Sequence, residues 1–199
     1  MSEKYLKLRK LDSQERQIVR CLIKNPRLSD NAIGRLTDIP IRTVNRKRKE
    51  LEEEGLLSYY TYLNIGPDGL KEFGARHLYL IKFKLGITQD QIIKEIKEEP
   101  NVRTVFTDLI YESHIAEIDG HTALIMIIEG QTDDDINNGF NGKILPSLEK
   151  NHGKGCVEQV STIRLSKPIR IFHNYLPMVN MEKGFIKRNW ADDAIFVIP

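Results

Sequence analysis

Three stretches near the start of the chain repeat apolar residues at helical spacing, and turn-forming residues separate them. Asp12 or Ser13 can cap the first helix, and Asn25-Pro26 ends it because the residue before a proline avoids helical angles. Ser29 or Asp30 can cap a short second helix. Pro40 suits the first position of a third helix, where its missing N–H is no loss. The pattern therefore predicts three helices within about 55 residues, with a tight turn at 37–40.

The third helix, over residues 40–54, has two unlike faces on a helical wheel at 100° per residue. Val44 and Leu51 nearly superpose, Ile41 lies within about 60° of them, and these three should form the inward stripe. The far side is cationic. Arginine can bond two guanine acceptors and asparagine can bond adenine in the same two-pronged way. We therefore expect base-edge contacts from Arg42, Asn45 and Arg46, and phosphate contacts from Thr43, Lys47, Arg48 and Lys49. A solvated helix surface is the alternative interpretation.

A β-prone segment follows Gly55 and contains three tyrosines between residues 56 and 63. We expect it to form a strand of a wing hairpin, with Tyr59 to Tyr62 near a sugar–phosphate backbone. The turn formers of residues 65–69 then mark a boundary. A first domain over 1–64 and a linker over 65–75 are predicted.

The rest of the chain alternates strand and helix patterns. Strands are expected at 76–85, from 102 to 111 with an extension toward 118, at 122–129 and at 157–165, and helices at 89–99 and 136–151. Asp119-Gly120 between two strands is a hairpin-turn signal. The order βαββαβ is the ferredoxin-like arrangement, here over residues 76–170. Its helices cover one face of the sheet, so the other face needs a partner, which favours a homodimer or a larger assembly.

Residues 171–199 form a predicted C-terminal extension that contains the only tryptophan, Trp190. Its many large apolar side chains disfavour disorder. We expect it to pack on its own sheet or on a neighbouring subunit.

Charge is distributed unevenly although the formal net charge of the chain is only +2. Residues 1–66 hold 14 Lys and Arg against 9 Asp and Glu, whereas residues 67–199 hold 16 against 19. A basic head on a mildly acidic body is expected where only the head meets phosphate. Cys21 and Cys156 are far apart without ligand-type neighbours, which favours a reducing cytoplasm, and no apolar run is long enough to cross a membrane.

Five short motifs in register make the chain similar to the leucine-responsive and asparagine-synthesis regulators, the Lrp/AsnC family, over about residues 8–170. They are Leu11-Asp12, Asn25-Pro26-Arg27, Ser29, Thr43-Val44 and the exit Leu51-Glu52-Glu53-Glu54-Gly55. The resemblance implies an α+β protein, with an N-terminal winged helix-turn-helix joined to a C-terminal ferredoxin-like domain. It also implies a transcription regulator that binds double-stranded DNA as a homodimer, tetramer or octamer.

The resemblance further implies a small-molecule effector at the second domain, for which Asp119, Gly120 and His121 are the candidate residues. The chain departs from the family pattern in several places. Pro40 and Lys47 stand where the family usually has serine and arginine, and Arg48 replaces an apolar residue. An aspartate that commonly follows the glycine of the effector turn is absent after Gly120.

Two other functions remain open at this stage. One is an enzyme on the same scaffold, similar to regulator-like chains that decarboxylate haem precursors. The other is a ligand-binding module that has lost DNA affinity. Glu112, His114 and Glu117, with Asp119 and His121, form a polar cluster around one turn, but their spacing matches no metal motif. We therefore predict no metal, no cofactor, no catalytic residues and no enzymatic activity.

Overall fold

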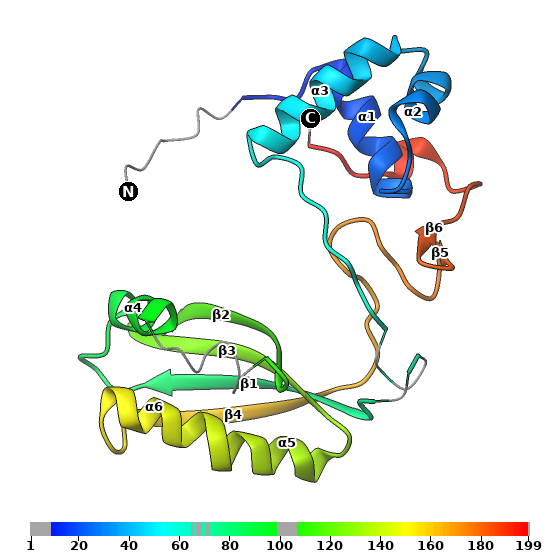
Figure 1. The fold of residues 1–199 in the computed structure, drawn as a ribbon. Helices are drawn as coiled ribbons and strands as arrows, with labels where there is room; N and C mark the ends of the chain where they lie inside the picture. The colour runs from blue at the N-terminus through cyan, green and yellow to red at the C-terminus, as the bar shows by residue number, and fades with distance from the viewer. Residues whose placement is uncertain (1–8, 65, 67–68, 71, 99–106, 199) are drawn as a thin grey trace. The chain divides into compact units, whose positions relative to one another are not determined.

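The computed structural model describes residues 9–64, 66, 69–70, 72–98 and 107–198 of the 199-residue chain. It divides into two compact units (Figure 1). The first combines residues 1–61 with residues 168–199, so both ends of the chain belong to it. The second comprises residues 62–167.

The first unit contains the three predicted helices, α1 (Ser13–Lys24), α2 (Asp30–Thr37) and α3 (Ile41–Glu53). Asp12 caps α1 in a reciprocal capping box with Glu15, and the Ser29 hydroxyl accepts a hydrogen bond from the Ala32 N–H at 3.2 Å. The turn between α2 and α3 uses Asp38 in the left-handed region, at φ 58°. The helices enclose one apolar core, formed by Ile18, Leu22, Ile33, Ile39 and Val44.

The predicted wing strand is not formed by residues 56–64. This segment leaves α3 through hydrogen bonds from the Leu56 and Leu57 N–H groups to the Leu51 carbonyl, and it continues without a strand partner. Its Tyr59 hydroxyl is instead engaged with α3, because it donates to Glu52 at 2.9 Å and accepts from Arg48 at 3.0 Å. The β propensity of the segment is therefore overridden by side-chain contacts with the preceding helix.

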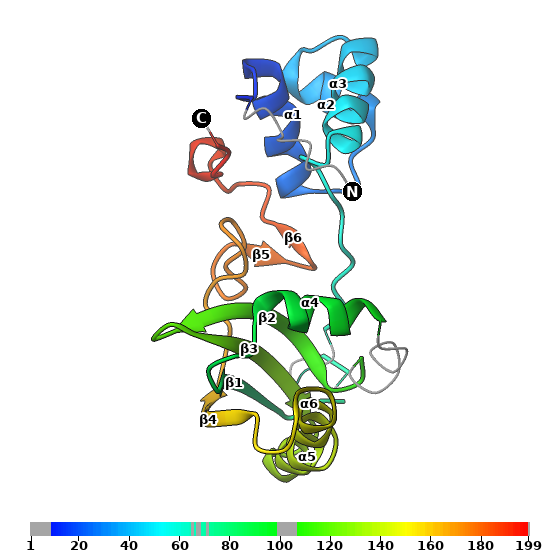
Figure 2. The same cartoon turned by 90° about the vertical axis from the view of Figure 1, so that its left-hand side faces the viewer.

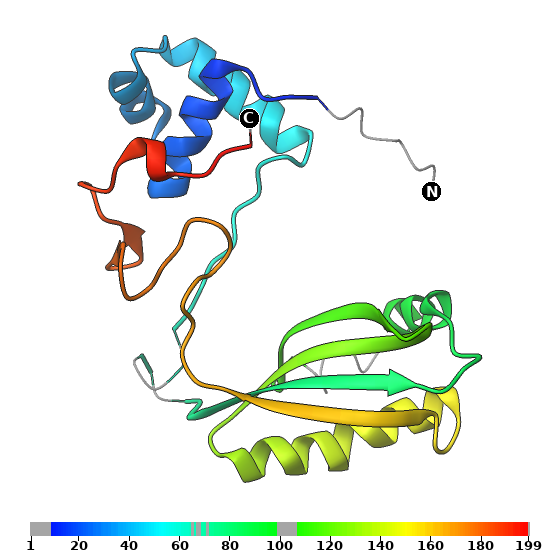
Figure 3. The ribbon, with the colours of Figure 1, turned by 180° about the vertical axis from the view of Figure 1, so that it is seen from behind.

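The C-terminal extension lies beside α1 in the first unit, whereas we expected it on the sheet or on a neighbouring subunit (Figure 3). Tyr175 donates to the Ile23 carbonyl at 3.1 Å, and the Lys24 ammonium bonds the Trp190 carbonyl at 2.6 Å. Ile186 and Ile195 are buried. The extension contacts α1 through β6, which contains Ile186, and burial of apolar side chains favours this association.

The extension has a small structure of its own. A two-residue turn joins β5 (Met181–Glu182) to β6 (Phe185–Ile186), and a 3-10 turn follows at Asp192–Ala194. The fully buried Asn180 side chain accepts from the Leu176 N–H and donates to the Asn174 carbonyl, each at 2.9 Å. Both hydrogen-bonding ends of this buried amide are satisfied, so burying it need not destabilise the extension.

The second unit is a four-stranded antiparallel sheet in the order β2-β3-β1-β4. The strands are β1 (Ala75–Phe83), β2 (Ile110–Ile118), β3 (His121–Gly130) and β4 (Val157–Leu165). Asp119 and Gly120 form the predicted hairpin turn, with φ 51° and 76°. The predicted second strand was placed too early, because residues 107–109 form a turn before β2, while residues 102–106 lie outside the described part.

Two helical segments pack on one face of this sheet (Figure 2). The first is α4 (Gln89–Glu98). The second runs continuously through α5 (Asp133–Gly139), a π-helical turn (Phe140–Ile144) and α6 (Leu145–His152). Alternate residues of β1, including Tyr79, Ile81 and Phe83, are buried in the same cluster as Ile92 of α4 and Phe140. The fold class predicted from the sequence is confirmed.

The opposite face of the sheet is also apolar. The strand register places Leu78 beside Ile127 and Ile163, and Leu80 beside Ile125. Ile163 is exposed, and the other four are partly exposed, although such residues are usually buried in a folded chain. We call these five residues the open sheet face.

Candidate nucleic-acid interface

Helix α3 turns one face into the core of the first unit and the other to solvent. Val44 and Leu51 are fully buried, as predicted, whereas Ile41 is 50% exposed and does not belong to the inward stripe. Arg42, Asn45, Arg46 and Lys49 are all exposed. The cationic side of the helix is therefore accessible, which is the arrangement that a groove-binding helix requires.

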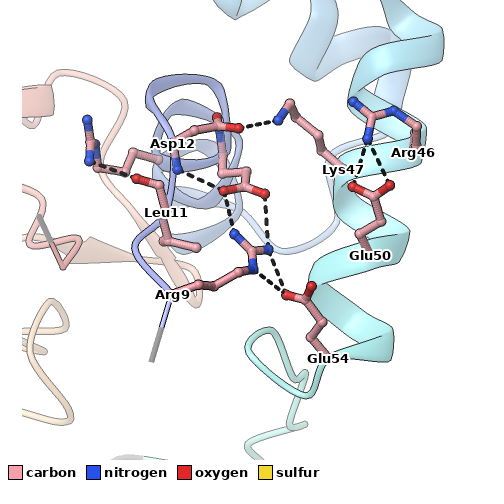
Figure 4. A network of polar contacts seen from close by, with 9 residues as sticks. Arg9, Leu11, Asp12, Arg46, Lys47, Glu50 and Glu54 are labelled. Atoms are coloured by element: carbon pink, nitrogen blue, oxygen red, sulfur yellow. Dashed lines mark hydrogen bonds and ion pairs between the residues drawn. The ribbon is translucent and has the colours of Figure 1, made fainter. Parts of the chain in front are cut away.

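Lys47 does not lie on that exposed side, and this corrects our expectation of a phosphate contact. Its side chain is 8% exposed and forms an ion pair with Asp12 at the start of α1 (Figure 4). Position 47 lies about 60° from Val44 and about 40° from Leu51 on the wheel, so the stem follows the edge of the core while the ammonium reaches a carboxylate. The hydrogen bond from Lys47 is the main cause of a lowered pKa at Asp12. Lys47 thus links two helices of the domain.

Arg48 is half-buried and is occupied by its own domain. Its guanidinium bonds the Leu28 carbonyl at 3.1 Å, Asp30 at 3.2 Å and Glu52 at 3.1 Å. It also lies 5.4 Å from the centroid of the Tyr59 ring, within the range of a cation–π contact. Five N–H donors in a planar fork suit such multiple contacts, so Arg48 fixes α3 against α2 more than it offers a free charge.

The remaining predicted residues carry weaker attachments or none. Arg46 pairs with Glu50 at 2.8 Å, and Lys49 pairs with Glu53 at 3.6 Å, both one helical turn apart on the surface. Exposed pairs of this kind contribute little to stability, so a phosphate can compete for the cation. Among the described residues, Arg42 has no ion-pair or hydrogen-bond partner. Thr43 is partly exposed beside it.

A hollow of about 490 Å³ lies where the first turns of α2 and α3 meet. Its lining consists of Ser29, Asp30, Asn31, Ile41, Arg42 and Asn45. Asn45 donates from Nδ2 to Asp30 Oδ2 at 2.8 Å across this hollow. Sequence reasoning missed the roles of Asp30 and Ile41. The helical wheel did not predict the exposure of Ile41, because residue 41 lies only about 60° from the buried Val44.

The proposed effector residues are part of the hairpin turn between β2 and β3. Asp119 is largely exposed, and its carboxylate lies 3.5 Å from the Lys82 ammonium. The His121 ring bonds the Phe83 carbonyl at 2.8 Å and lies 3.1 Å from Glu158. None of the three turn residues lines the hollow of about 660 Å³ between α4 and α6. Within the described residues, no three His, Cys, Asp or Glu side chains are placed to hold a metal ion.

Comparisons with known proteins agree with this geometry. Residues 11–58 match the family described as winged helix-turn-helix DNA-binding. A transcriptional regulator of Neisseria meningitidis, solved in complex with L-Met, has a TM-score of 0.57 at 17% identity, over 81% of this chain and 94% of that one. LrpC of B. subtilis has a TM-score of 0.56 at 18% identity, over 81% and 99%. AsnC of E. coli has a TM-score of 0.56 at 13% identity, over 82% and 97%.

The first domain is therefore a three-helix domain whose residues 11–58 match the winged helix-turn-helix DNA-binding family, although residues 56–64 form no wing strand. Together with the four-stranded sheet and its helices, it gives the chain the fold of the Lrp/AsnC regulators, so the resemblance seen in the sequence is confirmed. None of the curated proteins matches this chain. No helix in the described part of the chain is long and apolar enough to cross a membrane.

Proposed function

We propose that this chain is a sequence-specific DNA-binding transcription regulator of the Lrp/AsnC type. The observation that carries the proposal is the exposed side of α3, from which Arg42, Asn45 and Arg46 project while Val44 and Leu51 anchor the helix in the core. In this proposal α3 enters the major groove, those three residues meet base edges, and Thr43 and Lys49 meet phosphate. Lys47 and Arg48 act in support of the helix.

The experiment begins by mapping bound sites with genome-wide footprinting of the tagged protein. Affinity for a mapped site is then measured by fluorescence anisotropy for the native chain, Arg42→Ala, Arg46→Ala and the double variant. Lys97→Ala is the matched control, because Lys97 is exposed on α4 of the other domain. This substitution also removes one positive charge. We expect weaker binding for the α3 variants only. Unchanged binding in the double variant would remove α3 from the interface.

Salt dependence gives a second readout of the same contact. Binding that neutralises phosphates releases counterions, so affinity should fall steeply between about 50 and 200 mM salt. Lys49→Ala, which removes a proposed phosphate contact, should lower the slope of log affinity against log salt by about 1. A flat salt response of the native chain would contradict binding in a phosphate-lined groove.

We further propose that the chain assembles as a homodimer through the open sheet face. Both helical segments of the second unit pack on one face of the sheet, and the five apolar side chains of the open sheet face, on the other side, remain available to a partner. A second copy supplies the same apolar surface, which is how a twofold interface is built. A dimer also presents two recognition helices, which suits a pseudo-palindromic site with half-sites about 34 Å apart.

A small-molecule effector that acts through the second domain is part of the proposal, with Asp119, Gly120 and His121 as its contact residues. The regulator of Neisseria meningitidis, solved with L-Met, motivates amino acids as the first compounds to screen. The test is a thermal-shift screen of the native chain and Asp119→Ala. A compound that stabilises both proteins equally would show that the turn is not its binding site. We propose no enzymatic activity, and a porphyrin-type absorbance of the purified protein would contradict this.

A further inference from the structure

Ile41 is an apolar side chain placed among polar ones at the first turn of the recognition helix. It is 50% exposed and lines the same hollow as Arg42 and Asn45. Ile41 packs closely against Gly34 of α2. A Cβ added at Gly34 would lie 3.3 Å from Ile41 Cγ1 and 3.0 Å from the Ile39 carbonyl oxygen. The absence of a side chain at Gly34 therefore lets α2 and α3 approach closely while Ile41 keeps half of its surface free.

Asn45 lies one helical turn further along the same edge, and Asp30 determines which way its amide faces. Asp30 Oδ2 accepts from Asn45 Nδ2 at 2.8 Å, and because a carboxylate can only accept, the amide nitrogen must point toward it. Asp30 is itself held, since its other oxygen accepts from Arg48 at 3.2 Å. Asn45 therefore keeps one N–H and its carbonyl oxygen free. That donor and acceptor pair complements N7 and N6 of adenine.

The spacing of the two side chains also fits neighbouring bases. Residues four apart on a helix have Cβ atoms roughly 5–6 Å apart, which is between one and two base-pair steps of about 3.4 Å. The 5-methyl group of thymine is the one apolar feature of the major-groove edge, and aliphatic side chains recognise it by contact. An exposed isoleucine beside an oriented asparagine thus matches a short element made of A·T pairs.

We propose that Ile41 and Asn45 together read adjacent A·T pairs, with Ile41 on a thymine methyl and Asn45 on an adenine, and that Asp30 is the positioning residue for Asn45. The proposal rests on the proposed function, since it assigns base specificity to the same helix. It also predicts that a charged side chain of α2 contributes to recognition without touching DNA.

The test uses the mapped site in two modified forms. One replaces each thymine in turn with deoxyuridine, which removes only the 5-methyl group, and the other replaces each adenine with 7-deazaadenine, which removes N7. At one thymine we expect the native chain to lose about fourfold in affinity, the value of one buried methyl-sized group. Ile41→Ala should show a comparable loss on the natural site and no further loss on that deoxyuridine probe.

The adenine arm follows the same logic. Asn45→Ala should lose between about 5- and 150-fold on the natural site and become insensitive to 7-deazaadenine at one position. Asp30→Ala should reduce that sensitivity without changing affinity for unrelated DNA. Asp30→Asn should give a sensitivity between those of the native chain and Asp30→Ala, because its amide can accept from Asn45 Nδ2 or donate to the Asn45 oxygen. Thermal unfolding of each variant separates these effects from loss of folding.

Three results would contradict the proposal in different ways. If every deoxyuridine probe binds the native chain like the natural site while Arg42→Ala and Arg46→Ala still weaken binding, the methyl contact is wrong and the DNA-binding function stands. If Asp30→Ala keeps full sensitivity to 7-deazaadenine, Asp30 does not position Asn45. If no DNA fragment is bound, the proposed function fails together with the inference.

Discussion

The docking of the C-terminal extension on α1 can be tested at Ile186, whose side chain is only 4% exposed. Truncating a buried isoleucine to alanine removes its burial energy and leaves a cavity, at a combined cost of about 2–5 kcal/mol. The first unit comprises 61 residues from the start of the chain and 32 from its end. For a domain of this size each kcal/mol shifts the Tm by about 4–8 °C, so Ile186→Ala should lower the Tm of this unit by at least ~8 °C.

The assay can use a reporter that the chain already contains. Trp190 is the only tryptophan, and its carbonyl accepts from Lys24 at the end of α1. Its fluorescence should therefore change in the same transition that unfolds α1 to α3, as followed by circular dichroism and by loss of DNA binding. Met178→Ala is the control, because Met178 is 67% exposed in the same segment and its truncation should change stability by no more than about 0.5 kcal/mol.

Either of two outcomes would refute this reasoning. An unchanged Tm for Ile186→Ala would show that the side chain is not buried against the helical core in solution. A Trp190 transition well below the unfolding of the helices would show that the extension is a separate, weakly attached element. The expected result is a single transition in the native chain, whose midpoint Ile186→Ala lowers and Met178→Ala leaves unchanged.

Three further predictions concern the two units separately. Lys47→Met should lower stability and keep DNA affinity within about twofold, because Lys47 pairs with Asp12 inside the domain and not with phosphate. Thermal unfolding and fluorescence anisotropy measure the two effects, and a loss of DNA affinity as large as that of Arg42→Ala would contradict the prediction. The pKa of Asp12 is lowered from 3.8, so its carboxylate stabilises the fold above pH ~4 and loses this effect as pH falls through the lower folded value. Asp12→Asn should therefore be less stable than the native chain near neutral pH and less sensitive to acid as the pH falls below about 4, as pH-dependent denaturation would show. Leu80→Glu on the open sheet face should give monomers in size exclusion, with Lys97→Glu on α4 as the control, and an unchanged oligomer would move the interface elsewhere.

Local signals predicted much of the fold. Asp12 and Ser29 capped the helices that they were expected to open, and the strand predicted at 157–165 has the same ends in the structure. The two-residue turn at Asp119-Gly120 followed from the need for positive φ at both positions. Each of these features depends on a few neighbouring residues, so the sequence alone is informative about them.

Features that depend on distant residues were not predictable in the same way. The extension finds its partner about 150 residues away, at Ile23 and Lys24, and no local pattern specifies that choice. Side-chain directions on α3 also depend on residues outside that helix. Position 47 or position 48 could complete the stripe of Val44 and Leu51, and only the placement of Asp12 and Asp30 decides that the lysine turns inward and the arginine turns toward α2.

The two-ended composition of the first unit affects how the protein can be dissected. Connectivity makes the sheet domain an insertion between residues 61 and 168 of a discontinuous DNA-binding head. A protease that cuts once near residue 66 would nick the chain without releasing the head, since its last 32 residues would still be covalently joined to the sheet. A recombinant fragment that stops at residue 64 would hold all three helices and lack the C-terminal residues that contact α1. Transferring this unit onto another domain would therefore require two junctions in place of one.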